Sequence, residues 1–462
     1  MGPSKTSKQR LTQFSMWLKY FDSSNYQDDI ELPGQYSGSK EPNINRHIKI
    51  SSFDESLLVM GSMRRPKRLK MRGNDEKDYP YLIKGGEDLR LDQRVEQLFG
   101  VMNQIFKKTP ATSKRKLRIH TYQVIPMTNK VGIIEWLNNT KPLKAIVEEE
   151  LEKRGGKGAH ILKLPAAKMH DQWLKQYEKR AKQKVTSVSE YYYLMFKSAT
   201  RKETMYKMNK QYESVPWDIL RAGVLSLSRS PEAYLQIREH FARTLAVFSI
   251  GSYIIGIGDR HLDNFLLDLS NGGVIGIDFG HAFGSATQFL PIPELIPFRL
   301  TMQLQNFLKP LDSQGLLKHD MVHALSALQG GKEILLGTMD VFIKEPLLDW
   351  EKLARKLAAA QGSRGKQEKT WFPKKKIQIA RRKLECYNPA FVTMAELKDS
   401  VHQKRSYLNN VLNIVYGDKK HNIRAQTGEI CPSVKRQVDC LVDQATDDNI
   451  LGRTWGGWAS WI

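Results

Sequence analysis

Two acids and an amide in the middle of the chain have the types and spacing needed to handle magnesium-bound phosphate. Asp259 and Asn264 lie close together in GIGDRHLDNF, and Asp278 follows in IDFG. Magnesium is a hard ion that proteins usually bind through one or two carboxylates, together with phosphates and water. We therefore expect Asn264 and Asp278 to be metal ligands and Asp259 to accept a proton from a hydroxyl group.

The elements on either side of these residues would bring them together. The apolar run LAVFSIGSYII precedes Asp259 and is typical of a buried helix. The stretch FLLDLSNGGVIGI between Asn264 and Asp278 predicts two strands joined by a Gly-Gly turn. A surface turn after a core helix is the alternative interpretation of the first stretch alone. The DxxxxN spacing followed by DFG after a predicted hairpin favours a kinase-type catalytic loop.

Composition excludes several classes of protein. The chain has 462 residues, enough for two or three domains, and its 40% hydrophobic and 26% charged residues are ordinary for a globular protein. Three cysteines cannot form a disulfide framework, and their spacing matches no zinc site. The longest uncharged apolar stretch, residues 245–258, is too short to span a bilayer. The net charge of +23 indicates phosphate-bearing partners, which could be nucleic acid, nucleotide or anionic membrane.

The pattern along the chain predicts an α+β fold with a small β-rich lobe and a larger, mainly helical lobe. Short β-type runs over residues 46–134 are interrupted by one helix, in which Val95, Leu98, Met102 and Phe106 have helical spacing. Residues 135–137 form the expected connector, 138–400 the helical lobe and 430–462 a compact terminal unit. We expect residues 1–45 to be a linker and the basic segment 153–184 to be a solvent-exposed insertion.

The motifs depart from those of ordinary protein kinases in two ways. The histidine follows the catalytic acid, as Asp259-Arg260-His261, and MGSMRRPKR stands where a glycine-rich loop is usual. Together with IDFG and KGGEDLRLDQR, these sequences resemble the phosphatidylinositol 3-kinase-related protein kinases. The resemblance covers nearly the whole chain and implies a bilobal protein-kinase-like fold with a C-terminal helical FATC module. It also implies that residues 1–45 end a preceding helical FAT region and that the family's N-terminal helical repeats lie outside this chain.

The resemblance assigns roles to the residues of the small lobe. Lys84 is the nucleotide lysine, with Glu87 and Asp92 available to orient it, and the acid at the Asp92 position pairs with the lysine in the family. In MGSMRRPKR, a hydroxyl, backbone N–H groups and cations could cradle phosphate, although a charged hairpin tip is an equal alternative. The expected nucleotide-binding residues are Ser62, Arg64, Lys67, Lys84, Glu87, Asp92, Tyr122, Ile134, Glu135, Trp136 and Leu137.

In the connector, backbone groups of Glu135 and Leu137 would bond the adenine edge while Trp136 stacks on the ring. Packing of the aromatic ring between the lobes is a compatible alternative. The resemblance makes Asp259, His261 and Lys84 the catalytic residues, with His261 stabilising the transferring phosphoryl group. Asp263 is an extra carboxylate that either raises metal affinity or faces solvent, and we expect it to face solvent.

The expected activation loop runs from Gly276 to Thr301. It contains Thr287-Gln288, a possible phosphorylation site, and Arg299 is its only lysine or arginine. A polyanionic lipid headgroup would find few cations there, which favours a protein hydroxyl as substrate. In the tail, Trp455, Trp458 and Trp461 are three residues apart and would share one face of a helix, although two glycines weaken that helix. Packing on the large lobe is favoured over the alternative, a membrane-interface belt.

The resemblance therefore implies an ATP- and Mg²⁺-dependent serine/threonine protein kinase of the DNA-damage response, of the non-homologous end-joining type. The implied substrates are proteins with Ser/Thr-Gln sites, and the implied location is the nucleus. DNA ends would be met through a Ku-type heterodimer and regions outside this chain, with no stable membrane association. A lipid kinase of the same superfamily and a non-catalytic DNA-end-binding scaffold are the alternatives, and phosphate transfer to a Ser-Gln peptide distinguishes them.

Overall fold

The computed structural model describes residues 6–25, 30–36, 41–62, 64–155, 158, 160–344, 355 and 368–462. The chain divides into two compact units. Unit 1 comprises Met1–Gln97 and Thr121–Asn138, and unit 2 comprises Leu98–His120 and Asn139–Ile462. The division falls within α2 (Arg90–Lys108), so both units contribute to this helix. Unit 1 is rich in strands and unit 2 in helices, which confirms the predicted α+β class.

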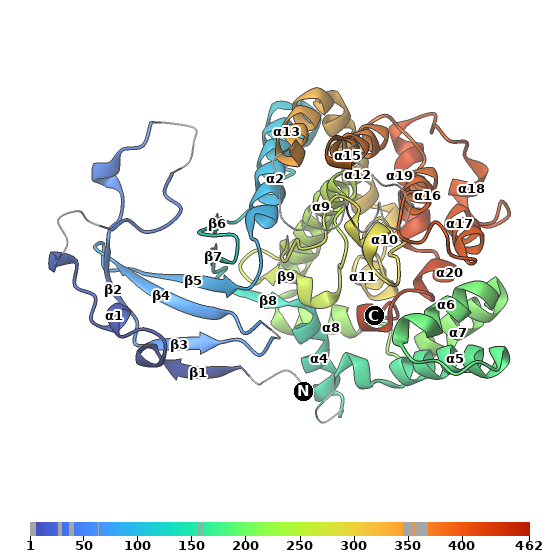
Figure 1. Cartoon of the computed structure of the whole chain (residues 1–462), viewed down its shortest axis with the longest axis horizontal. Helices are drawn as coiled ribbons and strands as arrows, with labels where there is room; N and C mark the ends of the chain where they lie inside the picture. The colour runs from blue at the N-terminus through green and yellow to red at the C-terminus, as the bar shows by residue number, and fades with distance from the viewer. Residues whose placement is uncertain are drawn as a thin grey trace. The chain divides into compact units, whose positions relative to one another are not determined.

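The strands of unit 1 form one antiparallel sheet, drawn from dark blue to teal in Figure 1. Their order is β1-β3-β4-β5-β7-β6, and β2 pairs with β4. In β4, Leu69 and Met71 are buried while Lys70 between them is not, as expected for a strand with one face on the core. The strands are β1 (Ser7–Arg10), β2 (Ile50–Phe53), β3 (Ser56–Val59), β4 (Lys67–Gly73), β5 (Asp78–Gly85), β6 (Val124–Pro126) and β7 (Val131–Glu135).

The prediction that residues 1–45 form a linker is wrong for the described part of that segment. β1 pairs along its whole length with β3, and α1 (Met16–Lys19) follows it. Leu11, Phe21 and Leu32 are buried in the core of unit 1. Because these apolar residues are widely spaced in a polar stretch, local composition concealed their contribution to the core.

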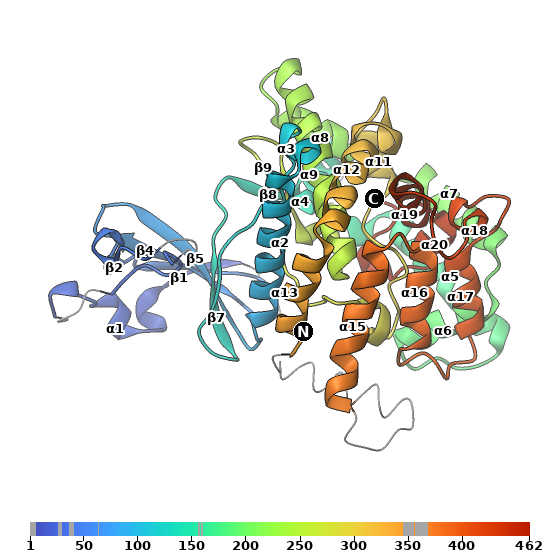
Figure 2. The same cartoon turned by 90° about the horizontal axis from the view of Figure 1, so that it is seen from above.

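Unit 2 is built from helices around a small sheet of order β10-β9-β8. Figure 2 shows α13, α15 and α16 side by side, consistent with their mutual packing. The strands are β8 (Thr140–Pro142), β9 (Phe265–Asp268) and β10 (Val274–Gly276). The helices after α2 are α3 (Pro110–Lys114), α4 (Leu143–Lys153), α5 (Pro165–Ala181), α6 (Val188–Ser198), α7 (Arg201–Glu213), α8 (Ile219–Leu227), α9 (Pro231–Ile255), α10 (Ser285–Phe289), α11 (Met302–Phe307), α12 (Leu316–Gly330), α13 (Lys332–Lys344), α15 (Glu368–Leu384), α16 (Pro389–Lys398), α17 (Leu408–Tyr416), α18 (Ile423–Gln426), α19 (Val434–Ala445) and α20 (Asp448–Leu451).

Helix α9 is the buried helix that the sequence predicts before Asp259. Ser230 caps its first turn by accepting a hydrogen bond from the Ala233 N–H, and Pro231 occupies the first helical position. From Leu245 to Ile255 every residue is buried. The helix ends at Gly256, whose φ of +74° lies in the left-handed region that glycine adopts without steric cost. The chain therefore leaves the core directly before the expected catalytic residues.

The predicted hairpin between Asn264 and Asp278 is confirmed. β9 and β10 pair antiparallel, and Gly272 in the connecting turn has a φ of +81°. The strand β10 packs against α9 so closely that Gly276 has no room for a side chain. A Cβ atom at Gly276 would lie 2.0 Å from Cζ of Phe248. The hairpin thus fixes Asp278 relative to the end of α9.

The segment 153–184, which we expected to be an exposed insertion, contains a helix with a buried face. Helix α5 buries Ala166, His170, Trp173, Leu174 and Tyr177, which lie along one side of the helix. The lysines of α5, which are Lys168, Lys175 and Lys179, are exposed, and the many lysines in the sequence of this segment led to the prediction of an exposed insertion. The correction matters because the end of α5 lines a groove described below.

The tail contains a short 3₁₀ turn, η7 (Gly456–Trp458), rather than the predicted helix carrying three tryptophans. Trp458 and Trp461 are buried in unit 2, whereas Trp455 is 45% exposed. Gly456 and Gly457 account for the short turn because glycine is a poor helix former. The predicted packing of the tail on the large lobe is confirmed for two of the three tryptophans. Within the described part of the chain, every helix is too short or too polar to span a membrane.

We predict opposite effects for two glycine-to-alanine substitutions. Gly276→Ala should lower the free energy of unfolding by about 1–3 kcal/mol, because the new methyl group overlaps the buried Phe248 ring. Gly337→Ala, in α13 with no atom within 4 Å of the new Cβ, should raise it by about 0.5–1 kcal/mol. Urea unfolding of both variants measures the difference, and an unchanged midpoint for Gly276→Ala would contradict the packing described here.

Candidate active site

The two expected catalytic acids both lie at turns with unusual backbone geometry. Asp259 follows α9 and has a φ of +59°, and Asp278 follows β10 and has a φ of +61°. The left-handed region costs a residue with a side chain about 1–2 kcal/mol. Such conformations persist only where the surrounding structure holds them, and they concentrate at functional sites. The contacts that hold these two turns therefore define the site.

The side chain of Arg260 joins the two turns. Its Nε donates to the Gly258 carbonyl at 2.9 Å and its Nη1 to the Ile277 carbonyl at 2.9 Å. Its Nη2 donates to the carbonyl of Asp278, and the guanidinium lies 5.5 Å from the centre of the Phe279 ring. Arg260 is only 2% exposed. Because one rigid, planar group binds the backbone of both turns, the two acids are held in a fixed relation.

Asn264 makes a second connection between the turns. Its Nδ2 donates to the Asp259 carbonyl at 2.8 Å, and its own carbonyl accepts from the Ile277 N–H at 3.1 Å. Its N–H donates to the His261 carbonyl at 3.0 Å, within the 3₁₀ turn η5 (Leu262–Asn264). Since the amide nitrogen is used within the loop, Oδ1 is the atom with which Asn264 would bind the expected metal ion.

The donor atoms of the site fit magnesium. Asn264 and Asp278 supply an amide oxygen and a carboxylate, which are hard ligands. Among the residues that the structure describes, no group of three or more His, Cys, Asp or Glu side chains could hold a metal ion. Magnesium usually takes its remaining ligands from phosphate and water.

His261 lies beside the expected base without a hydrogen bond to it. Its Nε2 is 4.0 Å from Oδ2 of Asp259. Burial lowers the pKa of His261, while the nearby carboxylate of Asp259 acts in the opposite direction. Asp263, the extra carboxylate of the loop, faces solvent with half of its side chain exposed and pairs with Lys144 at 2.8 Å. The expected orientation of Asp263 is thus confirmed.

Glu294 is a site residue that the sequence did not reveal. Its Oε1 accepts a hydrogen bond from the Asp259 N–H at 2.8 Å, so it helps to hold the left-handed turn of the expected base. Burial, and then the charge of Asp259, raise the pKa of Glu294 to about 7. The only signal in the sequence was one acid in the otherwise apolar run FLPIPELIPF.

Arg299, the single arginine of the expected activation loop, is buried and binds the tail of the chain. Its guanidinium donates to the carbonyls of Trp458 at 2.7 Å and Ala459 at 2.9 Å, and to the main-chain oxygen of Ile462 at 2.6 Å. It also stacks on the Trp458 ring at 4.1 Å and approaches the Arg260 carbonyl at 3.4 Å. Arg299 therefore ties the tail to the catalytic loop and is not available to a substrate.

In unit 1, three of the expected nucleotide-binding residues form one cluster. Nζ of Lys84 lies 3.1 Å from Oε1 of Glu87, and the other oxygen of Glu87 pairs with Arg64. Glu87 is thus shared by two cations. Asp92 lies in the first turn of α2 and is buried. Its expected pairing with Lys84 stays a prediction.

The loop of MGSMRRPKR is closed by the Met60 N–H, which donates to the Pro66 carbonyl at 2.9 Å. The Ser62 carbonyl accepts from the Arg65 N–H at 3.1 Å. Nζ of Lys67 donates to the Arg65 carbonyl at 3.3 Å and lies over the Phe14 ring. A contact of Lys67 with phosphate stays a prediction.

The connector residues take part in the sheet of unit 1. The Glu135 N–H donates to the Gln123 carbonyl at 2.9 Å, and the Trp136 N–H to the Pro80 carbonyl at 3.2 Å. Neither N–H is therefore the donor to an adenine edge, and the expected role of Glu135 is limited to its carbonyl. Arg68 stacks on Trp136 with its guanidinium 5.1 Å from the ring centre.

Two further residues that we expected to bind nucleotide, Ile134 and Tyr122, have contacts within the sheet of unit 1 and with helix α2. Ile134 in β7 pairs with Leu82 in β5 on one side. Tyr122 is buried, and its N–H donates to Oε2 of Glu96 at 3.1 Å. Burial raises the pKa of Glu96 well above its ordinary value. A direct contact of either residue with nucleotide stays a prediction.

The chain belongs to the phosphatidylinositol 3- and 4-kinase family, whose sequence model matches residues 78–352, and a FATC domain matches residues 431–462. The DNA-dependent protein kinase catalytic subunit of Dictyostelium discoideum is 57% identical over 99% of this chain, and that of Gallus gallus is 43% identical over 99%. The serine/threonine-protein kinase tor1 of Schizosaccharomyces pombe is 31% identical over 94% of the chain.

These relatives are much longer proteins. The chain covers 11% of each of the first two and 17% of the third, so it spans between about a tenth and a sixth of the length of these relatives. Among solved structures, the FAT and kinase domain of CtTel1 has a TM-score of 0.65 at 22% identity, covering 99% of this chain and 27% of that one. The predicted resemblance, including the FATC module, is confirmed.

The raised pKa of Glu294 predicts a pH dependence of stability. Because its folded-state pKa of about 7 exceeds the ordinary 4.5, the contribution of Glu294 is fully present below pH 4.5 and is lost as pH rises through 7. Glu294→Gln keeps the hydrogen-bond acceptor for Asp259 but cannot ionise. The stability of the wild type relative to this variant should fall by up to about 3 kcal/mol between pH 4.5 and 8. Urea unfolding across this range measures the difference, and two parallel pH profiles would contradict the burial of the carboxyl group.

Proposed function

We propose that the chain is the kinase portion of an ATP- and Mg²⁺-dependent serine/threonine protein kinase. It would transfer the γ-phosphate of ATP to Ser or Thr, preferentially before Gln, in the DNA-damage response of the non-homologous end-joining type. The observation that carries the proposal is the joining of the Asp259 and Asp278 turns by Arg260 and Asn264. Family membership and the names of the relatives support the reaction class.

Asn264 and Asp278 are the residues that would hold magnesium, and Lys84 would neutralise phosphate oxygens of the nucleotide. Bound magnesium supplies charge neutralisation on the phosphates during transfer. The protein's own contribution is positional: Asn264 is kept in place by its bond to the Asp259 carbonyl, and the backbone of Asp278 by Arg260. Glu87 orients Lys84 through their ion pair.

Asp259 is the proposed acceptor of the proton from the substrate hydroxyl. As the hydroxyl oxygen forms its bond to the γ-phosphorus, the proton passes to the carboxylate of Asp259 and the bond from phosphorus to the leaving ADP oxygen breaks. Glu294 holds the Asp259 N–H, and Arg260 holds the carbonyl just before it, at Gly258. His261 beside the carboxylate is the proposed stabiliser of the transferring phosphoryl group.

A protein substrate is favoured over a phosphoinositide by the charges around the activation loop. Arg299 is the only lysine or arginine between Gly280 and Thr301, and the tail carbonyls occupy it. Lys376 of α15 reaches the loop, but its buried ammonium donates to the Phe283 carbonyl at 2.5 Å and to the Gln288 side chain. An inositol phosphate would thus meet few available cations on this segment.

Phosphorylation of Thr287 stays a prediction. Its hydroxyl donates to the Glu294 carbonyl at 2.8 Å, and Gln288 is buried with its amide bound to the carbonyls of Glu396 and Asp399. A kinase that recognises Thr-Gln would have to draw α10 out of these contacts. Modification of Thr287 is therefore proposed only for an opened form of the loop.

The proposed partners and location follow from the relatives rather than from the site. We propose a nuclear protein that meets DNA ends through a Ku-type heterodimer and through parts of the longer protein outside this chain. The names of the Dictyostelium discoideum and Gallus gallus relatives support a link to DNA. The net charge of +23 is compatible with it but would equally suit nucleotide binding.

Two aspartates four positions apart provide a matched test. Asp259→Asn should lower phosphate transfer to a Ser-Gln peptide by about 10²–10⁴-fold, because the acceptor of the hydroxyl proton is lost. Asp263→Asn, which removes a solvent-facing carboxylate paired with Lys144, should leave transfer within about twofold. A radiolabelled-ATP assay with the peptide and with phosphatidylinositol vesicles measures both substrates.

Transfer to the vesicles but not the peptide would favour a lipid kinase. Absence of transfer to either substrate would favour a non-catalytic scaffold. Equal activity of the wild type and Asp259→Asn would contradict the proposed mechanism.

A further inference from the structure

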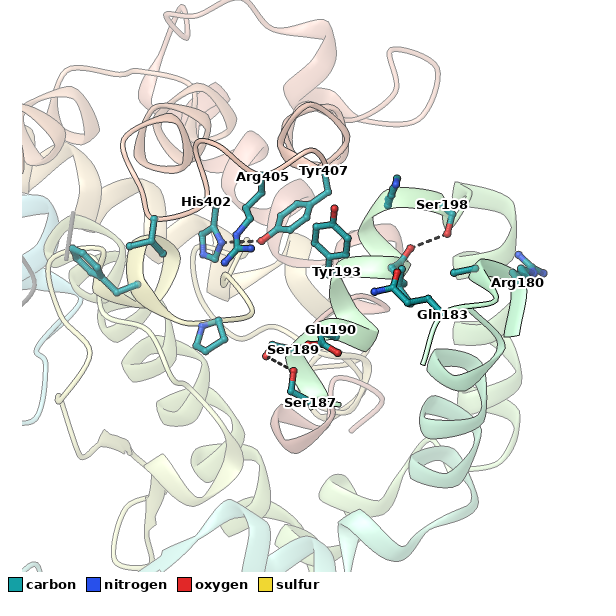
Figure 3. Close-up of a pocket in the computed structure, with 16 residues that line it drawn as sticks. Arg180, Gln183, Ser187, Ser189, Glu190, Tyr193, Ser198, His402, Arg405 and Tyr407 are labelled. Atoms are coloured by element: carbon teal, nitrogen blue, oxygen red, sulfur yellow. Dashed lines mark hydrogen bonds between the residues drawn. The ribbon is translucent and has the colours of Figure 1, made fainter. Parts of the chain in front are cut away.

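Unit 2 contains a groove that the proposed phosphate transfer does not use. Its volume is about 1230 Å³, larger than the usual pocket for a small ligand. Figure 3 shows its lining, which comes from the end of α5, from α6, from the turn before α17 and from the loop after α10. Of the lining side chains only Leu194, His402 and Tyr407 are buried, so the groove is open along its length to solvent. Such dimensions suit an extended peptide segment.

The groove is joined to the activation loop by hydrogen bonds. The Val401 N–H donates to the Gln288 carbonyl at 3.2 Å, and Nε2 of His402 lies 2.9 Å from the Leu290 carbonyl. Phe289 and Pro291 of the same loop form part of the lining. A chain lying in the groove would therefore run beside the segment that carries Thr287.

A short relay of contacts links this loop to the expected base. Thr287 donates its hydroxyl to the Glu294 carbonyl at 2.8 Å, and Oε1 of Glu294 accepts from the Asp259 N–H at 2.8 Å. All of these residues belong to unit 2. The groove and the catalytic turn are thus parts of one connected structure.

The charge of the lining is positive. Lys197 and Arg405 are exposed, and among the residues that the structure describes neither has an ion-pair partner. Arg180 adds a third cation, although it pairs with Glu203 at 2.6 Å. The one carboxylate of the lining, Glu190, is already bound by the N–H and hydroxyl of Thr186.

The floor of the groove is neutral. Burial lowers the pKa of His402 to about 4, so this ring is uncharged at pH 7. Its Nδ1 lies 2.8 Å from the Tyr407 hydroxyl, the contact drawn in Figure 3. The positive potential therefore comes from the exposed cations at the edges, which is the arrangement that attracts an acidic chain.

We propose that this groove binds an acidic segment of the protein substrate, next to the serine or threonine that receives phosphate. The assignment rests on the proposed kinase function and extends it to the choice of substrate. Lys197 and Arg405 would select carboxylates, and Tyr193 and the serine hydroxyls of α6 would bind the peptide backbone.

The test compares two peptides, each with one Ser-Gln pair: one carries a run of glutamates and its twin carries glutamines in their place. The groove variant is Lys197→Glu/Arg405→Glu. The control, Lys168→Glu/Lys420→Glu, changes the net charge equally at two exposed lysines outside the lining. Fluorescence anisotropy of labelled peptides measures binding without catalysis, and initial rates measure KM and kcat.

Wild type and control should bind the acidic peptide roughly tenfold more tightly than its twin, and the groove variant should lose this preference. In the groove variant, the KM for the acidic peptide should rise to the KM for the neutral twin. The kcat for the neutral twin should be the same in the groove variant as in the wild type. Equal binding of the two peptides to the wild type, or equal loss of preference in both variants, would overturn the proposal. So would a short single-stranded DNA that competes for the groove and loses its binding in the same variant.

The neutral twin separates this proposal from the one before it. If the wild type fails to phosphorylate the neutral twin, the proposed function is contradicted. If the neutral twin is phosphorylated and the acidic peptide gains nothing, only the groove assignment is contradicted.

Discussion

The guanidinium of Arg260 is the interaction on which the candidate site depends. It binds one carbonyl just before Asp259, that of Gly258, and two in the turn that carries Asp278. The side chain is almost fully buried. Removing a charge from water is expensive unless its hydrogen bonds are satisfied, and three carbonyls and an aromatic face provide that compensation here. Asp259 and Asp278 both have left-handed backbone conformations, which are unfavourable for residues with side chains. The hydrogen bonds of Arg260 are therefore needed to hold both turns in place.

A second buried arginine, Arg299, likewise holds main-chain groups together, in this case those of the tail. Arg299 binds three main-chain oxygens of residues 458–462 and touches the carbonyl of Arg260. The match of a FATC domain to residues 431–462 therefore has a physical counterpart, since Arg299 is hydrogen-bonded both to this module and to the Arg260 carbonyl in the loop that carries the expected base. Loss of the tail would remove three of the four main-chain oxygens that accept hydrogen bonds from Arg299 and leave only the Arg260 carbonyl, which is costly for a buried charge. The tail is thus a structural part of the unit that carries the expected base.

Much of this arrangement could be predicted from the sequence, because it rests on local patterns. The buried helix before Asp259, the hairpin between Asn264 and Asp278, and the core positions of α2 all follow from hydrophobic spacing. The roles of Arg260 and Glu294 could not be predicted, since their partners are main-chain groups that only the folded backbone presents. The same holds for Arg299: the sequence indicates only a cation in a loop, and its partners are main-chain carbonyls of the tail. Residues 1–45 and 153–184 misled the prediction because their average polarity hid a few well-spaced apolar side chains.

Hydrogen–deuterium exchange of the Arg260→Gln variant tests the central claim, that one side chain holds both acid-bearing turns. Peptides covering residues 257–264 and 276–281 should both exchange at least about tenfold faster than in the wild type, while the sheet of unit 1 keeps its protection. Faster exchange in both segments together would show that Arg260 holds both turns. Unchanged exchange in both segments, or loosening of only one, would contradict the account.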